Sequence, residues 1–202
     1  MPLTIFYWAM WSLWVYFTFL AKKNRTRDYV VIFLLASISC ATFSVSIPTL
    51  DINVTYLLFL FVGLYLFRPK KMRLTLYYVF IIFSLMLLYV LYYIYVLYDP
   101  AIFLLFDDWA LAIGLFLIIC LLVKDHRMRC ASLIMGQCMG EFLRVVVFYR
   151  FDHTVGHAGF LNQMAMVLVL VVAGHTIGNL TKQWHYYMAS RVQSDMNKQS
   201  KF

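Results

Sequence analysis

Long apolar runs follow one another along this chain, and only short charged or turn-forming segments separate them. Apolar residues make up 64% of the 202 residues and charged residues only 13%, whereas soluble domains are near half apolar and about a quarter charged. A run of about 20 apolar residues can cross a bilayer as a helix. The composition therefore predicts an integral membrane protein with no room for a separate soluble domain.

Seven runs are expected to form transmembrane helices in an all-α bundle. They cover residues 3–20, 29–47, 54–67, 74–98, 101–123, 130–150 and 160–180. The first run lacks a basic segment before it and a small-residue cleavage site after it, so it is interpreted as a retained helix and not as a signal peptide.

The segments outside these runs are short. Residues 48–53 are expected to form a brief outer turn. Residues 1–188 are assigned to the membrane domain, and residues 189–202 to a polar cytoplasmic tail that frays. Two alternatives remain for the start of the fifth run: residues 101–106 form a shallow re-entrant turn, or Asp107 and Asp108 lie inside the outer third of the membrane.

Basic residues predict the orientation. If the N-terminus is outside and the C-terminus is cytoplasmic, all of the 17 Lys and Arg residues except Arg144 and Arg150 lie on the cytoplasmic side, where short basic loops are retained. The net charge of +8 is therefore assigned to topology and not to nucleic-acid binding. The expected partners are the lipid bilayer and either another membrane protein or a second copy of the chain.

A cluster of polar side chains is predicted inside the membrane. Gln137, Glu141 and Arg144 recur every four and three residues and share one face of the sixth helix. Glu141 lies about 16 Å from the inner boundary at a rise of roughly 1.5 Å per residue. Asp107 or Asp108, on the fifth run, could share the Arg144 guanidinium.

Two interpretations of this cluster stay open. Either Glu141 and Arg144 neutralise each other and fix the helix register, or they line a cavity for protons or an anion. His175 on the seventh helix belongs to the predicted cluster, at about 9 Å from the inner boundary at roughly 1.5 Å per residue. A relay from His175 to Glu141 would need an intervening water.

No metal or cofactor site is predicted. His153 and His157 are spaced like metal ligands on a helix, but Gly156 and Gly159 argue against a helix there, and a solvated loop is expected. Haem is not indicated either. The cysteines have no CxxC spacing and are interpreted as packing thiols; they are Cys40, Cys120, Cys130 and Cys138.

Glycine spacing predicts that the sixth and seventh helices pack closely. Gly136 with Gly140, and Gly174 with Gly178, each form GxxxG. This spacing lets two helix backbones approach each other.

By its layout, and by the segments MGQCMGEFLR at 135–144 and GFLNQ at 159–163, the chain resembles the YphA-type small bacterial membrane proteins. The resemblance implies a bacterial plasma membrane and transfers no functional residue. Three functional classes are compatible with the sequence: a non-enzymatic membrane component, which the short loops favour; a small-molecule or proton-coupled transporter; and an intramembrane enzyme. The absence of a placed nucleophile argues against the enzyme.

Overall fold

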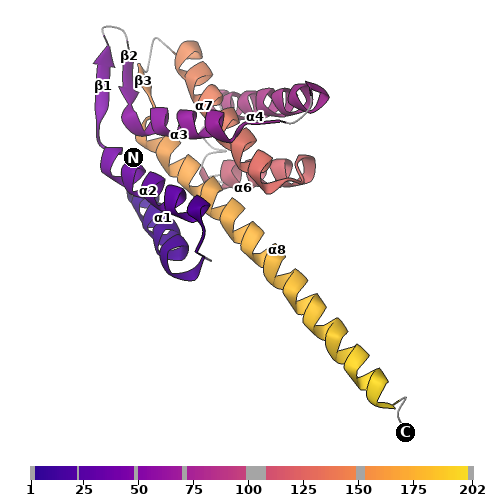
Figure 1. Ribbon diagram of the computed structural model, residues 1–202. Coiled ribbons are helices and arrows are strands. Elements are labelled where there is room, and N and C mark those ends of the chain that lie inside the picture. Colours follow the sequence, from indigo (N-terminus) through magenta and orange to yellow (C-terminus); the bar gives the residue numbers. More distant parts are fainter. Residues whose placement is uncertain are drawn as a thin grey trace.

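The structure is a computed structural model that describes residues 3–21, 23–47, 50–69, 72–98, 108–148 and 153–199. Helices dominate these residues, and a small three-stranded sheet lies at one end of the molecule (Figure 1). The C-terminal end of α8 lies at the opposite end. The prediction of a mostly helical chain is therefore confirmed.

The first helix, α1, covers Thr4–Val15 and continues as a π-helical segment over Tyr16–Leu20. Phe6, Met10 and Leu13 are buried. Their spacing of four and three residues places them on one face of α1. The helix packs against α8 and α2.

The second helix ends earlier than the sequence predicts. α2 covers Arg25–Cys40 and is followed by a β-hairpin of β1, Ser44–Ile47, and β2, Leu50–Asn53. The two strands pair antiparallel. The expected span over 29–47 is therefore wrong beyond Cys40. The expected turn over 48–53 is wrong for residues 50–53, which form β2, and residues 48 and 49 lie outside the described residues.

Asn53 gives a physical reason for this break. Its side-chain Nδ2 donates to the carbonyl of Ala41 at 2.9 Å, and its Oδ1 accepts from the N–H of Thr55 at 2.8 Å. One side chain thus satisfies a backbone group at the end of α2 and another at the start of α3, where helix termini leave such groups without a partner.

A third strand joins the hairpin to a distant part of the chain. β3, Thr154–Val155, pairs parallel with β2, and Asp51 lies opposite Thr154. The N–H of Asp51 also donates to the carbonyl of His153 at 2.9 Å. The strand order is β1-β2-β3, so the sheet holds the loop before α8 beside the start of α3.

The other helices are α3, Val54–Leu66; α4, Met72–Tyr98; α6, Asp108–Leu122; α7, His126–Val147; and α8, Ala158–Gln199. α8 runs as one helix through most of the tail that was expected to fray. Asp107 and the undecided segment 101–106 lie outside the described residues.

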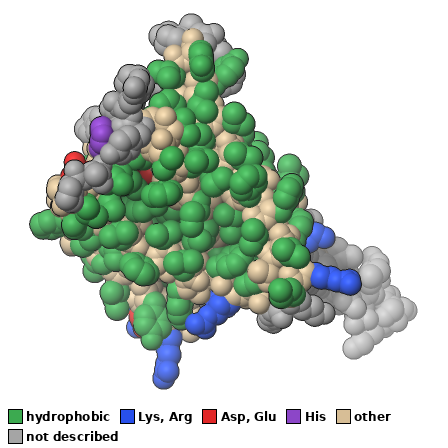
Figure 2. All heavy atoms as spheres, turned by 90° about the horizontal axis from the view of Figure 1, so that it is seen from above, with side chains coloured by type: hydrophobic (Ala, Val, Ile, Leu, Met, Phe, Trp, Pro, Cys, Tyr) green, Lys and Arg blue, Asp and Glu red, His purple; other side chains and the backbone are tan. Residues whose placement is uncertain are grey.

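Three helical segments are long and apolar enough to cross a membrane: α4, α7 and the part of α8 over Ala158–Gly178. Shorter apolar helices cover Thr4–Leu20, Val54–Leu66 and Trp109–Leu122. Figure 2 shows a face on which hydrophobic side chains predominate, with Lys and Arg at its border. Such a surface suits hydrocarbon and not water.

Gly136 and Gly140 pack against a different helix from the one predicted. A Cβ on Gly136 would lie 2.8 Å from Leu85 Cβ, and a Cβ on Gly140 would lie 2.8 Å from Tyr89 Cδ1. Leu85 and Tyr89 belong to α4. These two glycines therefore allow α4, and not α8, to approach α7.

Gly174 and Gly178 differ from each other. A Cβ on Gly174 would lie 2.9 Å from Phe116 Cζ on α6, whereas Gly178 faces open space. The predicted glycine interface between the last two helices is therefore wrong. α7 packs chiefly against α4 and α3, and α8 packs chiefly against α1 and α6.

Candidate functional site

One face of α7 carries the polar side chains that the sequence singles out. Gln137, Glu141 and Arg144 are all buried, whereas Phe142 and Val146, on the opposite side of the helix, are at least half exposed. The helical period separates the two sets. The polar face of α7 therefore points into the protein, and the apolar face points outward.

Glu141 lies at the centre of a group of hydrogen-bond donors. Its Oε2 accepts from the Tyr89 hydroxyl at 3.0 Å and from Arg144 Nε at 2.8 Å. Its Oε1 accepts from Arg144 Nη2 at 3.1 Å and from the N–H of Gly156 at 3.1 Å, and it lies 2.8 Å from His157 Nδ1. A carboxylate offers about four lone-pair sites. The acceptor capacity of Glu141 is therefore filled.

His157 donates to Glu141 through Nδ1. Arg144 Nη2 also lies 3.1 Å from this nitrogen, but its two hydrogens are used by Glu141 and by the carbonyl of Thr154 at 3.3 Å. The shorter contact to the carboxylate therefore assigns the ring proton to Nδ1. The guanidinium of Arg144 also lies over the Tyr93 ring, 5.6 Å from its centroid, as a cation–π contact.

Gly156 positions the loop that brings His157 to this cluster. Its φ is +78°, a conformation that residues with a Cβ rarely adopt. A Cβ there would also lie 2.7 Å from Tyr56 Cβ. Position 156 therefore requires glycine. The turn it forms directs the Gly156 N–H and the His157 side chain toward Glu141.

Comparison with known proteins identifies the family. The model of the family described as "YphA-like integral membrane protein" matches residues 3–199. The chain belongs to this family. The chain is also 26% identical over 176 residues to "Uncharacterized protein YphA" of Bacillus subtilis (strain 168), a match that covers 82% of this chain and 83% of the relative. No solved structure matches the chain.

In this YphA-like protein, His175 does not join the cluster. Its ring stacks on that of His126 near the start of α7, with centroids 3.9 Å apart and an angle of 16° between the planes. The prediction that His175 and Glu141 belong to one site is therefore wrong. The reason is the antiparallel course of α7 and α8, which places His175 beside the opposite end of α7 from Arg144.

His157 is the residue of this cluster that the sequence does not predict. The sequence predicts a solvated loop for His153 and His157, yet the His157 side chain is 29% exposed and bonds to a fully buried carboxylate. A signal was present in the sequence: Arg144 stands one turn before the end of the helix, so a short loop to the next helix must pass near it.

The remaining predicted site residues are placed as follows. Asp108 begins α6, and its side chain is not described. Both polar atoms of the buried Gln137 amide lack a hydrogen-bond partner among the described residues. The four cysteines are free thiols. Within the described ranges, no group of three metal-ligating side chains is placed to hold a metal ion.

Proposed function

We propose that this YphA-like protein is a non-enzymatic, multi-pass component of the bacterial plasma membrane, acting as a structural element or through a protein partner. In this proposal the chain crosses the membrane seven times, with its N-terminus outside and its C-terminus in the cytoplasm. The distribution of Lys and Arg along the sequence supports this orientation.

The observation that carries the structural role is the filled acceptor capacity of Glu141. Its donors come from α4, from α7 and from the loop before α8. A carboxylate that binds a transported solute or relays protons needs an acceptor site that exchanges partners, and Glu141 keeps none open. The cluster therefore suits a structural role, in which these hydrogen bonds fix the loop before α8 to α7.

A proton-coupled transporter is the second candidate, and Gln137 is the observation that favours it. This residue lies one turn from Glu141 and is 1% exposed, yet neither amide atom has a partner among the described residues. A buried amide of this kind binds water where space allows. Water at Gln137 would extend the polar cluster toward the middle of the membrane.

One set of purified proteins tests both candidates. The singles Glu141→Gln and Arg144→Met and the double variant are compared with wild type for thermal unfolding in detergent and for proton flux in proteoliposomes with an internal pH dye. Breaking a buried ion pair typically costs about 3 to 5 kcal/mol, and neutralising both partners costs less. The double variant should therefore be more stable than either single.

Wild-type liposomes should leak protons no faster than protein-free liposomes. Flux that is present in wild type and lost in a well-folded double variant would replace the structural proposal with the transporter. If Glu141→Gln and Arg144→Met are as stable as wild type, the structural role of the Glu141 cluster is contradicted.

A further inference from the structure

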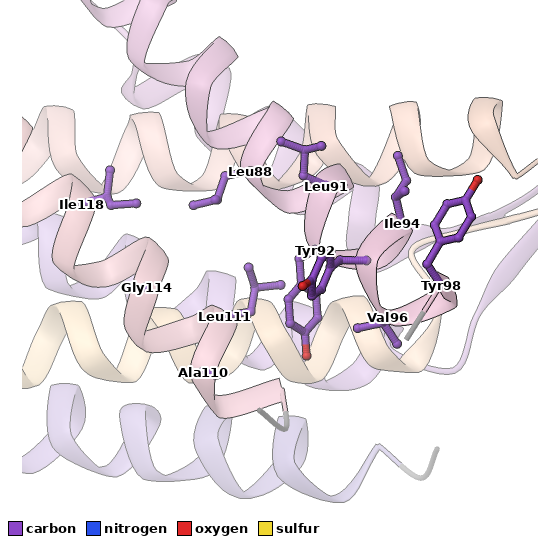
Figure 3. Close-up of a pocket in the computed structure, with 11 residues that line it drawn as sticks. Leu88, Leu91, Tyr92, Ile94, Val96, Tyr98, Ala110, Leu111, Gly114 and Ile118 are labelled. Carbon is purple, nitrogen blue, oxygen red and sulfur yellow. The ribbon is translucent and has the colours of Figure 1, made fainter. Parts of the chain in front are cut away.

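An apolar groove of about 700 Å³ lies between α4 and α6 (Figure 3). Leu88, Leu91 and Ile94 line it from α4, and Leu111, Gly114 and Ile118 line it from α6. Its volume lies in the range of about 300 to 1,000 Å³ that small-molecule sites occupy. The Glu141 cluster contributes no lining residue, so the groove is a separate site.

The groove follows from how the glycines pair the helices. α4 approaches α7 at Gly136 and Gly140, whereas α6 approaches α8 at Gly174. Because α4 and α6 each belong to a different close pair, they touch each other only weakly. Gly114 widens the gap further, since nothing lies within 4 Å of the place where its Cβ would be.

The groove opens onto an exposed apolar surface of the kind that suits hydrocarbon. Leu91 on its rim is 58% exposed, and Ile113 and Leu117 on the neighbouring face of α6 are also exposed. Water does not fill a space with apolar walls in this setting. Hydrocarbon is therefore the medium that occupies it.

One end of the groove is polar. Tyr92, Tyr95 and Tyr98 line it near the end of α4, and Tyr98 is 84% exposed. Tyrosine is enriched at the level of lipid headgroups, where its ring is in hydrocarbon and its hydroxyl in water. The groove thus has a long apolar part and a polar end, which is the pattern of a phospholipid.

We propose that this groove is a lipid-binding site, occupied by one acyl chain of a membrane phospholipid whose headgroup lies at the Tyr95 and Tyr98 end. The lipid fills the space between the α4–α7 and α6–α8 pairs. This site is independent of the structural role proposed for Glu141.

Native mass spectrometry of the full chain in detergent tests the site, with dioleoylphosphatidylglycerol as the probe. Gly114→Leu adds a side chain inside the groove, at a position where a Cβ meets nothing within 4 Å. Gly178→Leu is the matched control, because its Cβ also meets open space but lies outside the groove. Leu91→Trp is a second filling variant at an exposed position.

Wild type and Gly178→Leu should retain one phospholipid through detergent exchange. Both filling variants should bind the probe at least about tenfold more weakly, a loss of about 1.4 kcal/mol in binding free energy. Circular dichroism should show that their helix content is unchanged. Equal lipid binding in all four proteins would overturn the proposal. A mass of two chains in place of chain plus lipid would assign the groove to a second copy and would also overturn it.

Discussion

At the scale of single residues, Glu141 is held by donors that are not equivalent. Arg144 supplies a full charge from one turn away on the same helix, so this bond forms wherever α7 forms. Tyr89, Gly156 and His157 reach the carboxylate only when α4 and the loop before α8 are in place. Removing any one of these three hydrogen bonds therefore weakens the tertiary structure and leaves the formation of α7 itself unaffected.

His157→Ala should lower the free energy of unfolding by about 1.5 to 3 kcal/mol, the usual contribution of a hydrogen bond to a charged group. His153→Ala is the matched control, because it makes the same change at an exposed position of the same loop. Thermal unfolding in detergent measures both variants. If the two alanine variants unfold at the same temperature, the 2.8 Å contact from His157 to Glu141 does not contribute to folding.

At the scale of elements, glycine decides which helices become neighbours. Gly136 and Gly140 stand four residues apart on α7, and the backbone they expose receives Leu85 and Tyr89 of α4. Close approach at Gly140 also brings the Tyr89 hydroxyl within reach of Glu141. Helix packing and the polar cluster therefore depend on the same contact.

Gly140→Ala should destabilise the protein by about 1 to 3 kcal/mol, because the added methyl overpacks against Tyr89. Gly178→Ala makes the same chemical change in open space and should be neutral or stabilising by up to about 1 kcal/mol through helix propensity. Unfolding midpoints measured in one detergent compare the two. A Gly178→Ala variant that is as unstable as Gly140→Ala would show that the destabilisation at position 140 does not come from its contact with Tyr89.

At the scale of the whole molecule, the sheet and the C-terminal end of α8 lie at opposite ends (Figure 1). The proposed topology assigns the sheet to the outside. The junctions after α1, after α3 and after α6, each with Lys or Arg, would then face the cytoplasm.

Impermeant thiol reagents applied to intact cells check this assignment. Ser46→Cys, at an exposed position in β1, should react. Asn24→Cys and Met72→Cys, which are also exposed, should react only after the cells are opened. The wild-type protein gives the background of its four native cysteines. Labelling of Met72→Cys in intact cells would reverse or refute the proposed orientation.

The amino-acid sequence by itself determined the class of the protein, the approximate places of its helices, and the pairing of Glu141 with Arg144. These properties follow from local hydrophobicity and from the helical period, which a single segment contains. The sequence also carried the family resemblance that the comparison confirmed.

Only the tertiary structure decided which helices touch, where the hairpin interrupts the second run, and that His157 rather than His175 reaches Glu141. Gly136 and Gly140 mark an interface, but their spacing does not say whether α4 or α8 fills it. Asn53 ends one helix and starts another through bonds to both, and His157 meets Glu141 across a turn set by Gly156. Such contacts join segments distant in the chain, and their energy depends on the folded geometry and not on any local pattern.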